Sequence, residues 1–120
     1  MDIIQRASPQ PFETKDGSTI RELLAHRNSR IRNQSLAEAT VPAGVRTQAH
    51  YHPLSEEIYY ILSGSGVMHL GDESRTIGPG DAIAIPPGEV HWIENPNQVD
   101  LVFLCCCAPG YEHADTVIVG

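Results

Sequence analysis

Residues 50–57 of the chain are HYHPLSEE, in which His50 and His52 stand one residue apart, shortly before the glutamates Glu56 and Glu57. Residues two apart on a β-strand project from the same face, so a strand here would hold both imidazoles side by side. Imidazole nitrogens and a carboxylate oxygen together suit divalent transition metals such as Fe, Mn, Ni, Co, Cu or Zn. On these residues alone, a metal site and two surface histidines beside a solvated acidic turn are equally open.

The rest of the chain has the pattern of an all-β protein. Turn signals such as Pro42-Ala43-Gly44 and Asn95-Pro96-Asn97 separate short segments rich in β-branched and aromatic residues, which predicts a sandwich or barrel. The segment TIRELLAHR (19–27) fits a short helix or an extended arm equally well. The expected strands are SLAEATVPA (35–43), EIYYILSG (57–64), GVMHLG (66–71), RTIG (75–78), DAIAIP (81–86), VHWIEN (90–95) and DLVFLCCC (100–107).

Composition excludes several classes of protein. The 120 residues fit one domain, and a net charge of −7 with Lys15 as the only lysine argues against a nucleic-acid partner. No apolar run reaches the roughly 18 residues of a membrane span. The first residues, MDIIQRASPQ, lack the pattern of a secretory leader, so we expect a cytoplasmic protein with no membrane partner.

Strand alternation extends the histidine face toward the N-terminus. If RTQAHYH (46–52) is a strand, Arg46 and Gln48 share the face of His50 and His52. Arg46 would then clamp a carboxylate of a substrate, or else lie at the rim in water. Gln48 would be a polar residue of the substrate pocket.

The same alternation places two further groups. Tyr59 shares the face of Glu57 and would either hydrogen-bond a ligand in the pocket or pack in the core with its hydroxyl satisfied. In the strand expected over residues 90–95, His91 and Ile93 share a face opposite Trp92.

Three adjacent cysteines, Cys105, Cys106 and Cys107, lie at the end of the last expected strand. Cys105 and Cys107 would face the same side as Phe103, with Cys106 on the other side, and neighbouring strand residues are poorly placed for a disulfide. Buried cysteine usually behaves as a small hydrophobic residue, which is the favoured interpretation. The alternative is that one face of the triplet lines the metal cavity with a thiol open to oxidation.

Glycines and prolines recur around the histidines at fixed spacing. The chain carries G-x5-H-x-H-x4-E-x6-G over residues 44–64 and G-x5-P-x-G-x2-H-x3-N over residues 80–95. These patterns resemble the two signature motifs of the cupin superfamily. The flanking segments DGSTIRELL (16–24) and PGYEHADTVIV (109–119) are similar to those of small single-domain bacterial cupins.

The resemblance implies a fold and an assembly. The expected fold is an all-β double-stranded β-helix, a jelly-roll-like barrel, over residues 1–120 as one domain. Residues 1–34 would form an N-terminal arm with strands, residues 44–95 the two motifs, and residues 108–120 a C-terminal tail. Cupins of this kind are often homodimers, so a homodimer is expected.

The resemblance also implies a site of one divalent metal per chain. Its ligands would be His50, His52, Glu57 and His91, since each falls on a motif position. Glu56 is the competing carboxylate, and the six-residue step to the following glycine selects Glu57.

Metal-dependent cupins include dioxygenases, isomerases and lyases, so the resemblance favours an enzyme. A small metal-dependent oxygenase acting on an oxygen-rich or enolisable small molecule is the leading hypothesis, with the metal as activation centre. An isomerase or lyase is an alternative. A module that binds metal or a small ligand without turnover, and a domain that works through a partner protein, are the others.

Overall fold

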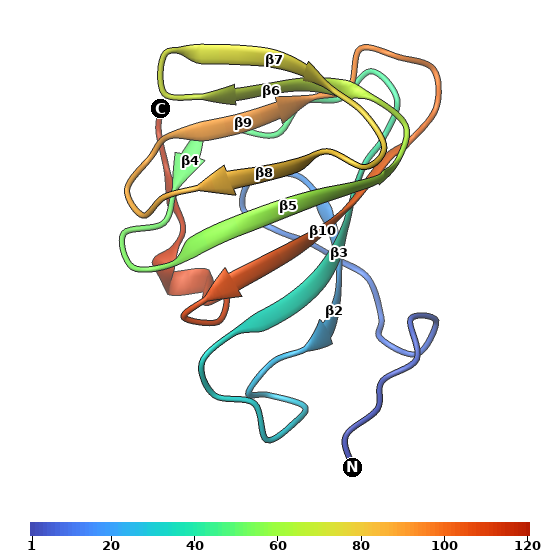
Figure 1. The fold of residues 1–120 in the computed structure, drawn as a ribbon, viewed down its shortest axis with the longest axis vertical. Helices are drawn as coiled ribbons and strands as arrows, with labels where there is room; N and C mark the ends of the chain where they lie inside the picture. Colours follow the sequence, from blue (N-terminus) through green and yellow to red (C-terminus); the bar gives the residue numbers. More distant parts are fainter.

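The computed structural model describes all 120 residues, and they form two antiparallel β-sheets (Figure 1). From β4 onward the chain passes repeatedly between the sheets, which is the predicted double-stranded barrel. The six-stranded sheet runs β1 (Phe12–Glu13), β2 (Thr19–Leu24), β3 (Ser35–Val41), β10 (Leu101–Ala108), β5 (Glu56–Ser63) and β8 (Ala82–Ile85). The five-stranded sheet runs β11 (Val117–Ile118), β4 (His50–Tyr51), β9 (His91–Glu94), β6 (Gly66–Leu70) and β7 (Glu73–Ile77).

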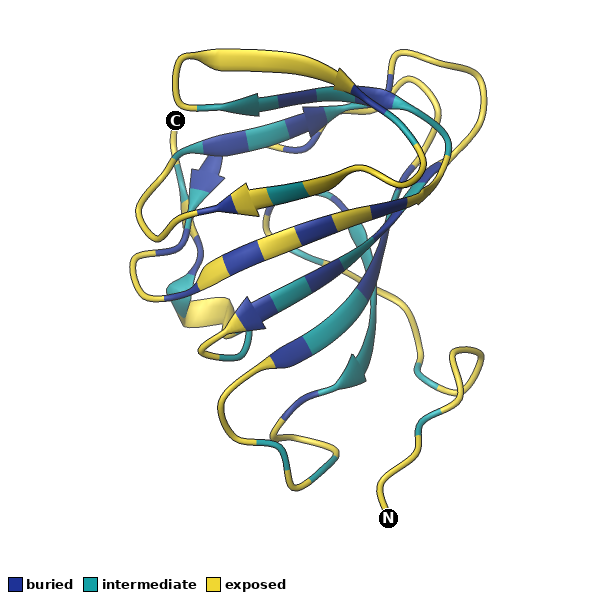
Figure 2. Cartoon of the chain, viewed as in Figure 1, coloured by how far each residue is buried: buried dark blue, intermediate teal, exposed yellow.

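Burial alternates along the strands as the pattern of the sequence predicts. Figure 2 shows the alternation on β5, where Glu57, Tyr59 and Ile61 are buried and the residues between them are exposed. On β10 the odd-numbered positions from Leu101 to Cys107 face inward. One face of each strand therefore builds the interior of the barrel, which is where a site enclosed by the sheets must draw its side chains.

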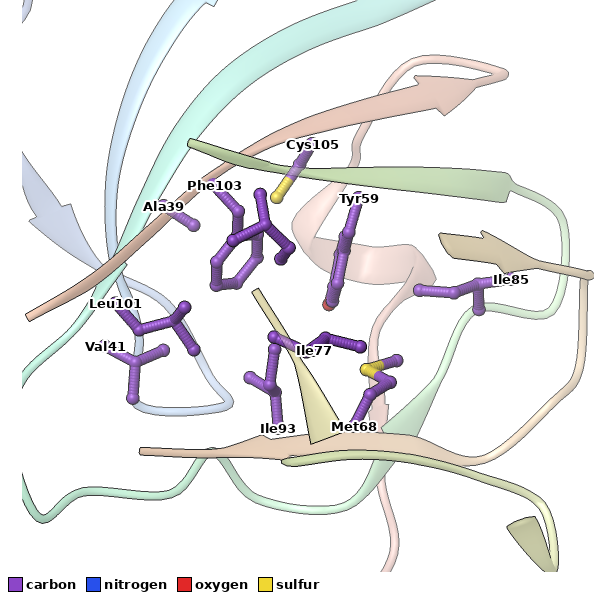
Figure 3. Close-up of a cluster of buried hydrophobic side chains, with 11 residues drawn as sticks. Ala39, Val41, Tyr59, Met68, Ile77, Ile85, Ile93, Leu101, Phe103 and Cys105 are labelled. Carbon is purple, nitrogen blue, oxygen red and sulfur yellow. The ribbon is translucent and has the colours of Figure 1, made fainter. Parts of the chain in front are cut away.

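The core lies between the two sheets (Figure 3). Tyr59 and Phe103 pack against each other at its centre, with ring centroids 4.6 Å apart. The other members are aliphatic or sulfur-containing side chains from both sheets: Ala39, Val41, Ile61, Met68, Ile77, Ile85, Ile93, Leu101 and Cys105. This packing supports one end of the interior, and the remaining space is left to polar residues.

Two motif residues hold the barrel together without any chemical role. Gly64 has a φ of +78°, and a Cβ at this position would collide with the carbonyl oxygen of Asp100. The buried amide of Asn95 donates to the carbonyl oxygens of Val41 at 2.9 Å and Val99 at 2.8 Å. Both residues tie turns to neighbouring strands, so their place in the motif follows from packing.

The sequence fitted a helix or an extended arm equally well at residues 19–27, and in the structure residues Thr19–Leu24 of this segment form strand β2. β2 pairs antiparallel with β3, and the chain turns at Ala25, whose N–H donates to Asn28 Oδ1. Pairing with β3 gives the backbone of this short segment its hydrogen bonds, which a helix would otherwise have to supply internally. The only helix is the three-residue 3₁₀ turn η1 (His113–Asp115), so no helix is long enough to cross a membrane.

Candidate metal centre

Three buried imidazoles meet inside the barrel. His50 on β4 and His91 on β9 are opposite each other on neighbouring strands of the five-stranded sheet, and His52 is the first residue after β4. The ring centroids of His50 and His91 are 4.3 Å apart, and His52 lies 5.2 Å from His50 and 5.6 Å from His91. One ligand nitrogen from each ring lies within 4.8 Å of the other two, so the geometry suits a shared ion.

Each of these rings is oriented by a backbone carbonyl. In all three the Nδ1 atom lies at hydrogen-bond distance from a carbonyl oxygen, which can only accept, so Nδ1 carries the hydrogen. This leaves Nε2 as the free nitrogen of each ring, an arrangement typical of metal-binding histidines. The acceptors are Gln48 at 2.8 Å for His50, Asp115 at 3.0 Å for His52 and Glu89 at 2.9 Å for His91.

The carboxylate of Glu57 stands beside two of these nitrogens. Its Oε1 atom lies 3.4 Å from His52 Nε2 and 3.6 Å from His91 Nε2, and its side chain is 6 % exposed. Both Glu57 Oε1 and His91 Nε2 are buried without a hydrogen-bond partner. Buried polar atoms are almost always paired, so this pair of unpartnered atoms fits a cation between them. Glu56 lies exposed on the outer side of β5 and is remote from the rings.

Charge is distributed unevenly within the cluster. Burial raises the pKa of Glu57, but the closely placed His52 and His91 outweigh it and lower that pKa to about 2. Burial lowers the pKa of His52, and the neighbouring Glu57 more than reverses this, so the His52 pKa is raised. For His50, burial and the nearby His91 lower the pKa. A carboxylate and neutral imidazole nitrogens are the protonation states that a metal requires.

The donor set therefore fits a divalent transition metal. Three imidazole nitrogens and one carboxylate oxygen would hold an ion such as iron, manganese, cobalt, nickel, copper or zinc. The structure brings together all four residues at the motif positions, and their coordination of a metal stays a prediction.

Two expected pocket residues lie elsewhere. Arg46 is exposed, with its guanidinium carbon 5.3 Å above the ring of Trp92 on the outer side of the five-stranded sheet. Gln48 is also exposed, and neither residue lines the cavity beside the histidines. The prediction that they share the face of His50 is wrong because the segment is not a continuous strand. Only His50–Tyr51 forms β4, and Thr47 is buried between its exposed neighbours.

Tyr59 and two of the cysteines do line this cavity. Tyr59 is buried, with its ring centroid 6.0 Å from that of His91. Cys107 donates a hydrogen bond from Sγ to Glu57 Oε2 at 3.2 Å, while Cys106 faces outward. Burial, then the charge of Glu57, raises the pKa of the Cys107 thiol far above its usual range, so it is a neutral donor that orients the carboxylate. Cys105 and Cys107 thus line the cavity, as in the alternative for the triplet, while Cys105 also packs in the hydrophobic core, as in the favoured interpretation.

Two residues of the site were missed from the sequence. Asp16 lies in the turn between β1 and β2, with Oδ2 3.5 Å from His50 Nε2. Tyr111 lines the same cavity, with its ring centroid 6.3 Å from that of His52 and a buried hydroxyl that has no partner. Both fall in the flanking segments that resemble small cupins, but neither belongs to a metal-binding motif, so no local signal singled them out.

The C-terminal residues close one side of the site. β11 pairs with β4, and the carbonyl oxygen of Asp115 orients His52. The Asp115 carboxylate accepts the backbone N–H groups of Leu54 at 3.1 Å and Ser55 at 3.0 Å. The tail is thus a structural part of the site, because it fixes the loop that carries His52.

Comparison with known proteins agrees with this architecture. The model of the Cupin domain family matches residues 37–107. An uncharacterised protein of Methanocaldococcus jannaschii is 52 % identical over 110 residues, which cover 92 % of this chain and 88 % of that protein.

Solved structures share the fold over most of the chain. A predicted oxalate decarboxylase from Thermotoga maritima has a TM-score of 0.78 and 28 % identity, covering 88 % of this chain and 97 % of that one. The polyketide cyclase RemF from Streptomyces resistomycificus has a TM-score of 0.82 and 27 % identity, covering 100 % of this chain and 86 % of that one. With both sheets and both motifs in place, the chain belongs to the cupin family.

Proposed function

We propose that this cupin is a metal-dependent enzyme acting on a small oxygen-bearing molecule, with an oxygenase as the leading reaction class. The observation that carries the proposal is the convergence of three Nε2 atoms whose rings are each fixed by a carbonyl at Nδ1. His50, His52, His91 and Glu57 would hold one divalent transition metal. Such an ion supplies Lewis-acid activation, and with iron it also supplies redox chemistry toward oxygen.

The chain's own residues give this site the enclosure that catalysis needs. His50 and His52 line a cavity that Phe103 and Tyr59 also line, so a bound molecule would be largely screened from water. Cys107 and the backbone carbonyls keep the ligands in place. His50, His52, Glu57 and His91 would hold the ion, and coordination positions beyond these four ligands would be available to a substrate.

The names of two similar structures support an oxygen-bearing substrate. One similar structure is described as a predicted oxalate decarboxylase and another as a polyketide cyclase, and both names refer to oxygen-rich carbon compounds. An isomerase or lyase would use the same Lewis acid without oxygen. A binding module would retain the metal and the cavity without turnover.

The first test is elemental analysis of untagged protein purified without a nickel column. We expect about one tightly held transition metal per chain. Oxygen uptake should then be followed with a panel of small enols and hydroxy ketones, with the His91→Ala variant as the control. Metal with oxygen uptake supports the oxygenase, and metal with product but no uptake supports a lyase or isomerase. Metal without turnover supports a binding module, and no metal even after reloading contradicts the proposal.

A further inference from the structure

The turn at residues 14–18 carries a carboxylate whose two oxygens have different surroundings. Oδ1 of Asp16 accepts hydrogen bonds from Thr14 Oγ1 at 2.5 Å, Ser18 N at 2.9 Å and Ser18 Oγ at 2.7 Å. The backbone carbonyl of Asp16 accepts the N–H of Gln48 at 2.7 Å, which ties the turn to the segment before β4. Oδ2 is left beside His50 Nε2, at 3.5 Å, and Asp16 lines the cavity of the metal centre.

Oδ2 of Asp16 has no hydrogen-bond donor in the protein. The nearest nitrogen is His50 Nε2, but the hydrogen of this ring is on Nδ1 and points to the carbonyl of Gln48. A metal on Nε2 would leave it equally without a hydrogen. Oδ2 is therefore free to accept a hydrogen bond, and a molecule in the cavity can offer it an O–H group in a charge-assisted bond.

Asp16 is unlike Glu57 in its relation to the three rings. Glu57 Oε1 stands near two of the Nε2 atoms, whereas Asp16 contacts His50 alone. Its position at one edge of the cluster suits a contact to a molecule bound next to the metal better than a place among the ligands.

The charge of the cavity favours an uncharged guest. Its lining includes the carboxylates of Asp16, Glu22 and Glu57 but no lysine or arginine. Glu22 is paired with Arg27, at 2.5 Å, on the exposed side. A divalent metal with Glu57 and Asp16 is already neutral, so a dianion would add two uncompensated negative charges in a region of low dielectric. An uncharged molecule avoids this cost.

Part of the cavity lining is apolar. Phe12, Ile20, Ala39 and Phe103 line the cavity, which suits a hydrocarbon or aromatic frame. The cavity thus offers an apolar surface, a metal position and the Asp16 carboxylate as a hydrogen-bond acceptor.

We infer that the site binds an uncharged molecule with a hydroxyl group next to a second oxygen on an apolar frame, and that Asp16 selects it by accepting the hydroxyl hydrogen bond. The inference rests on the proposed metal centre, which the two oxygens would face. Asp16 is a specificity-determining residue in this scheme, and it discriminates against small dicarboxylates such as oxalate.

Two probes of similar chelating geometry test this. Catechol is uncharged at neutral pH and carries adjacent hydroxyls, and oxalate is a dianion. With zinc-loaded protein in a calorimeter, we expect the wild type to bind catechol more tightly than oxalate. The Asp16→Asn variant keeps an oxygen for Thr14 and Ser18 and places an amide group where Oδ2 was. The ratio of the two affinities should then shift toward oxalate by about tenfold or more, as for loss of a charge-assisted hydrogen bond.

Controls separate this inference from the metal centre itself. The Glu94→Gln variant makes the same change in net charge on the outer side of β9, and it should leave the ratio unchanged. Zinc content should stay at about one per chain in Asp16→Asn. Loss of zinc from that variant would make Asp16 a metal ligand and overturn the selective role. Tighter binding of oxalate than of catechol by zinc-loaded wild type, or an unchanged ratio in Asp16→Asn, would also overturn it. Failure of the wild type to take up metal would instead defeat the proposed function.

Discussion

Neighbouring residues of β9 belong to two different histidine environments. His91 points inward to the metal centre, while Trp92 points outward and stacks on His69, with ring centroids 4.4 Å apart and an interplanar angle of 7°. Glu94 hydrogen-bonds His69 on the same outer side, and the guanidinium of Arg46 lies over the Trp92 ring. We call these four residues, His69, Trp92, Glu94 and Arg46, the outer stack.

The difference between the two environments lies in the state of the imidazole nitrogens. In the outer stack, His69 Nε2 is already paired with a partly exposed carboxylate. In the metal centre, Nε2 of His91 is fully buried and unpaired, and its ring is held by a carbonyl at Nδ1. A histidine beside a glutamate is therefore no sign of a metal site by itself, and what matters is how many free nitrogens converge.

A matched pair of histidine substitutions, one in the metal centre and one in the outer stack, should have the largest difference in effect. His91→Ala should abolish stoichiometric metal binding while the barrel stays folded, because it removes one of three convergent nitrogens. His69→Ala should retain about one metal per chain, since it has no part in the cluster. Elemental analysis after dialysis, with circular dichroism for folding, measures both. Wild-type metal retention in His91→Ala would show that the ligand set is wrong.

Substitutions on the inner and outer faces of the six-stranded sheet should differ in their effect on the free energy of unfolding. Phe103 is 2 % exposed and packs on Tyr59, so Phe103→Ala should lower the free energy of unfolding by about 3–5 kcal/mol. Leu62 is 42 % exposed on the outer face of β5, and Leu62→Ala should cost less than about 1 kcal/mol.

Urea denaturation of metal-free protein compares these two variants without the contribution of metal binding. Equal losses would contradict the assignment of inner and outer faces. An effect of Leu62→Ala that depends on protein concentration would show that another chain covers the outer face, as expected for a homodimer.

Metal affinity should depend on pH through the residues of the metal centre, and not through those of the outer stack. Burial lowers the pKa of His52, but Glu57 and Asp115 outweigh it and raise that pKa, so protons compete with the metal for this ring up to a higher pH than for an ordinary imidazole. Metal needs the neutral ring, so affinity should increase with pH until the His52 pKa is passed, by up to about tenfold per unit. Glu57, with a pKa of about 2, stays ionised throughout this range and adds no slope.

Competition with a chelator at several pH values measures this slope. The His69→Ala variant should give the same curve as the wild type, since the outer stack does not touch the metal centre. A flat profile between about pH 6 and pH 8 would contradict the proton competition at His52.

Much of the inner surface followed from local sequence pattern. A strand exposes alternate residues on opposite faces, so the inward positions of β5, β9 and β10 could be predicted once the strands were located. These inward positions depend on two-residue periodicity, which short stretches of chain encode. His50, His52, Glu57 and His91 were singled out as a set by the resemblance of their spacing to the cupin motifs.

Other features of the site were decided by contacts between distant segments. Arg46 and Gln48 left the predicted face because the chain before β4 is tied by hydrogen bonds to Ile93 and Asp16 instead of continuing as a strand. Asp16 reaches the histidines only because the turn before β2 lies against the segment before β4, and Tyr111 does so because the tail folds back toward His52. Sequence periodicity determined which side chains point inward along each strand. The tertiary structure alone determined which loops meet over the metal centre, because loop contacts between residues far apart in the chain have no periodic pattern to reveal them.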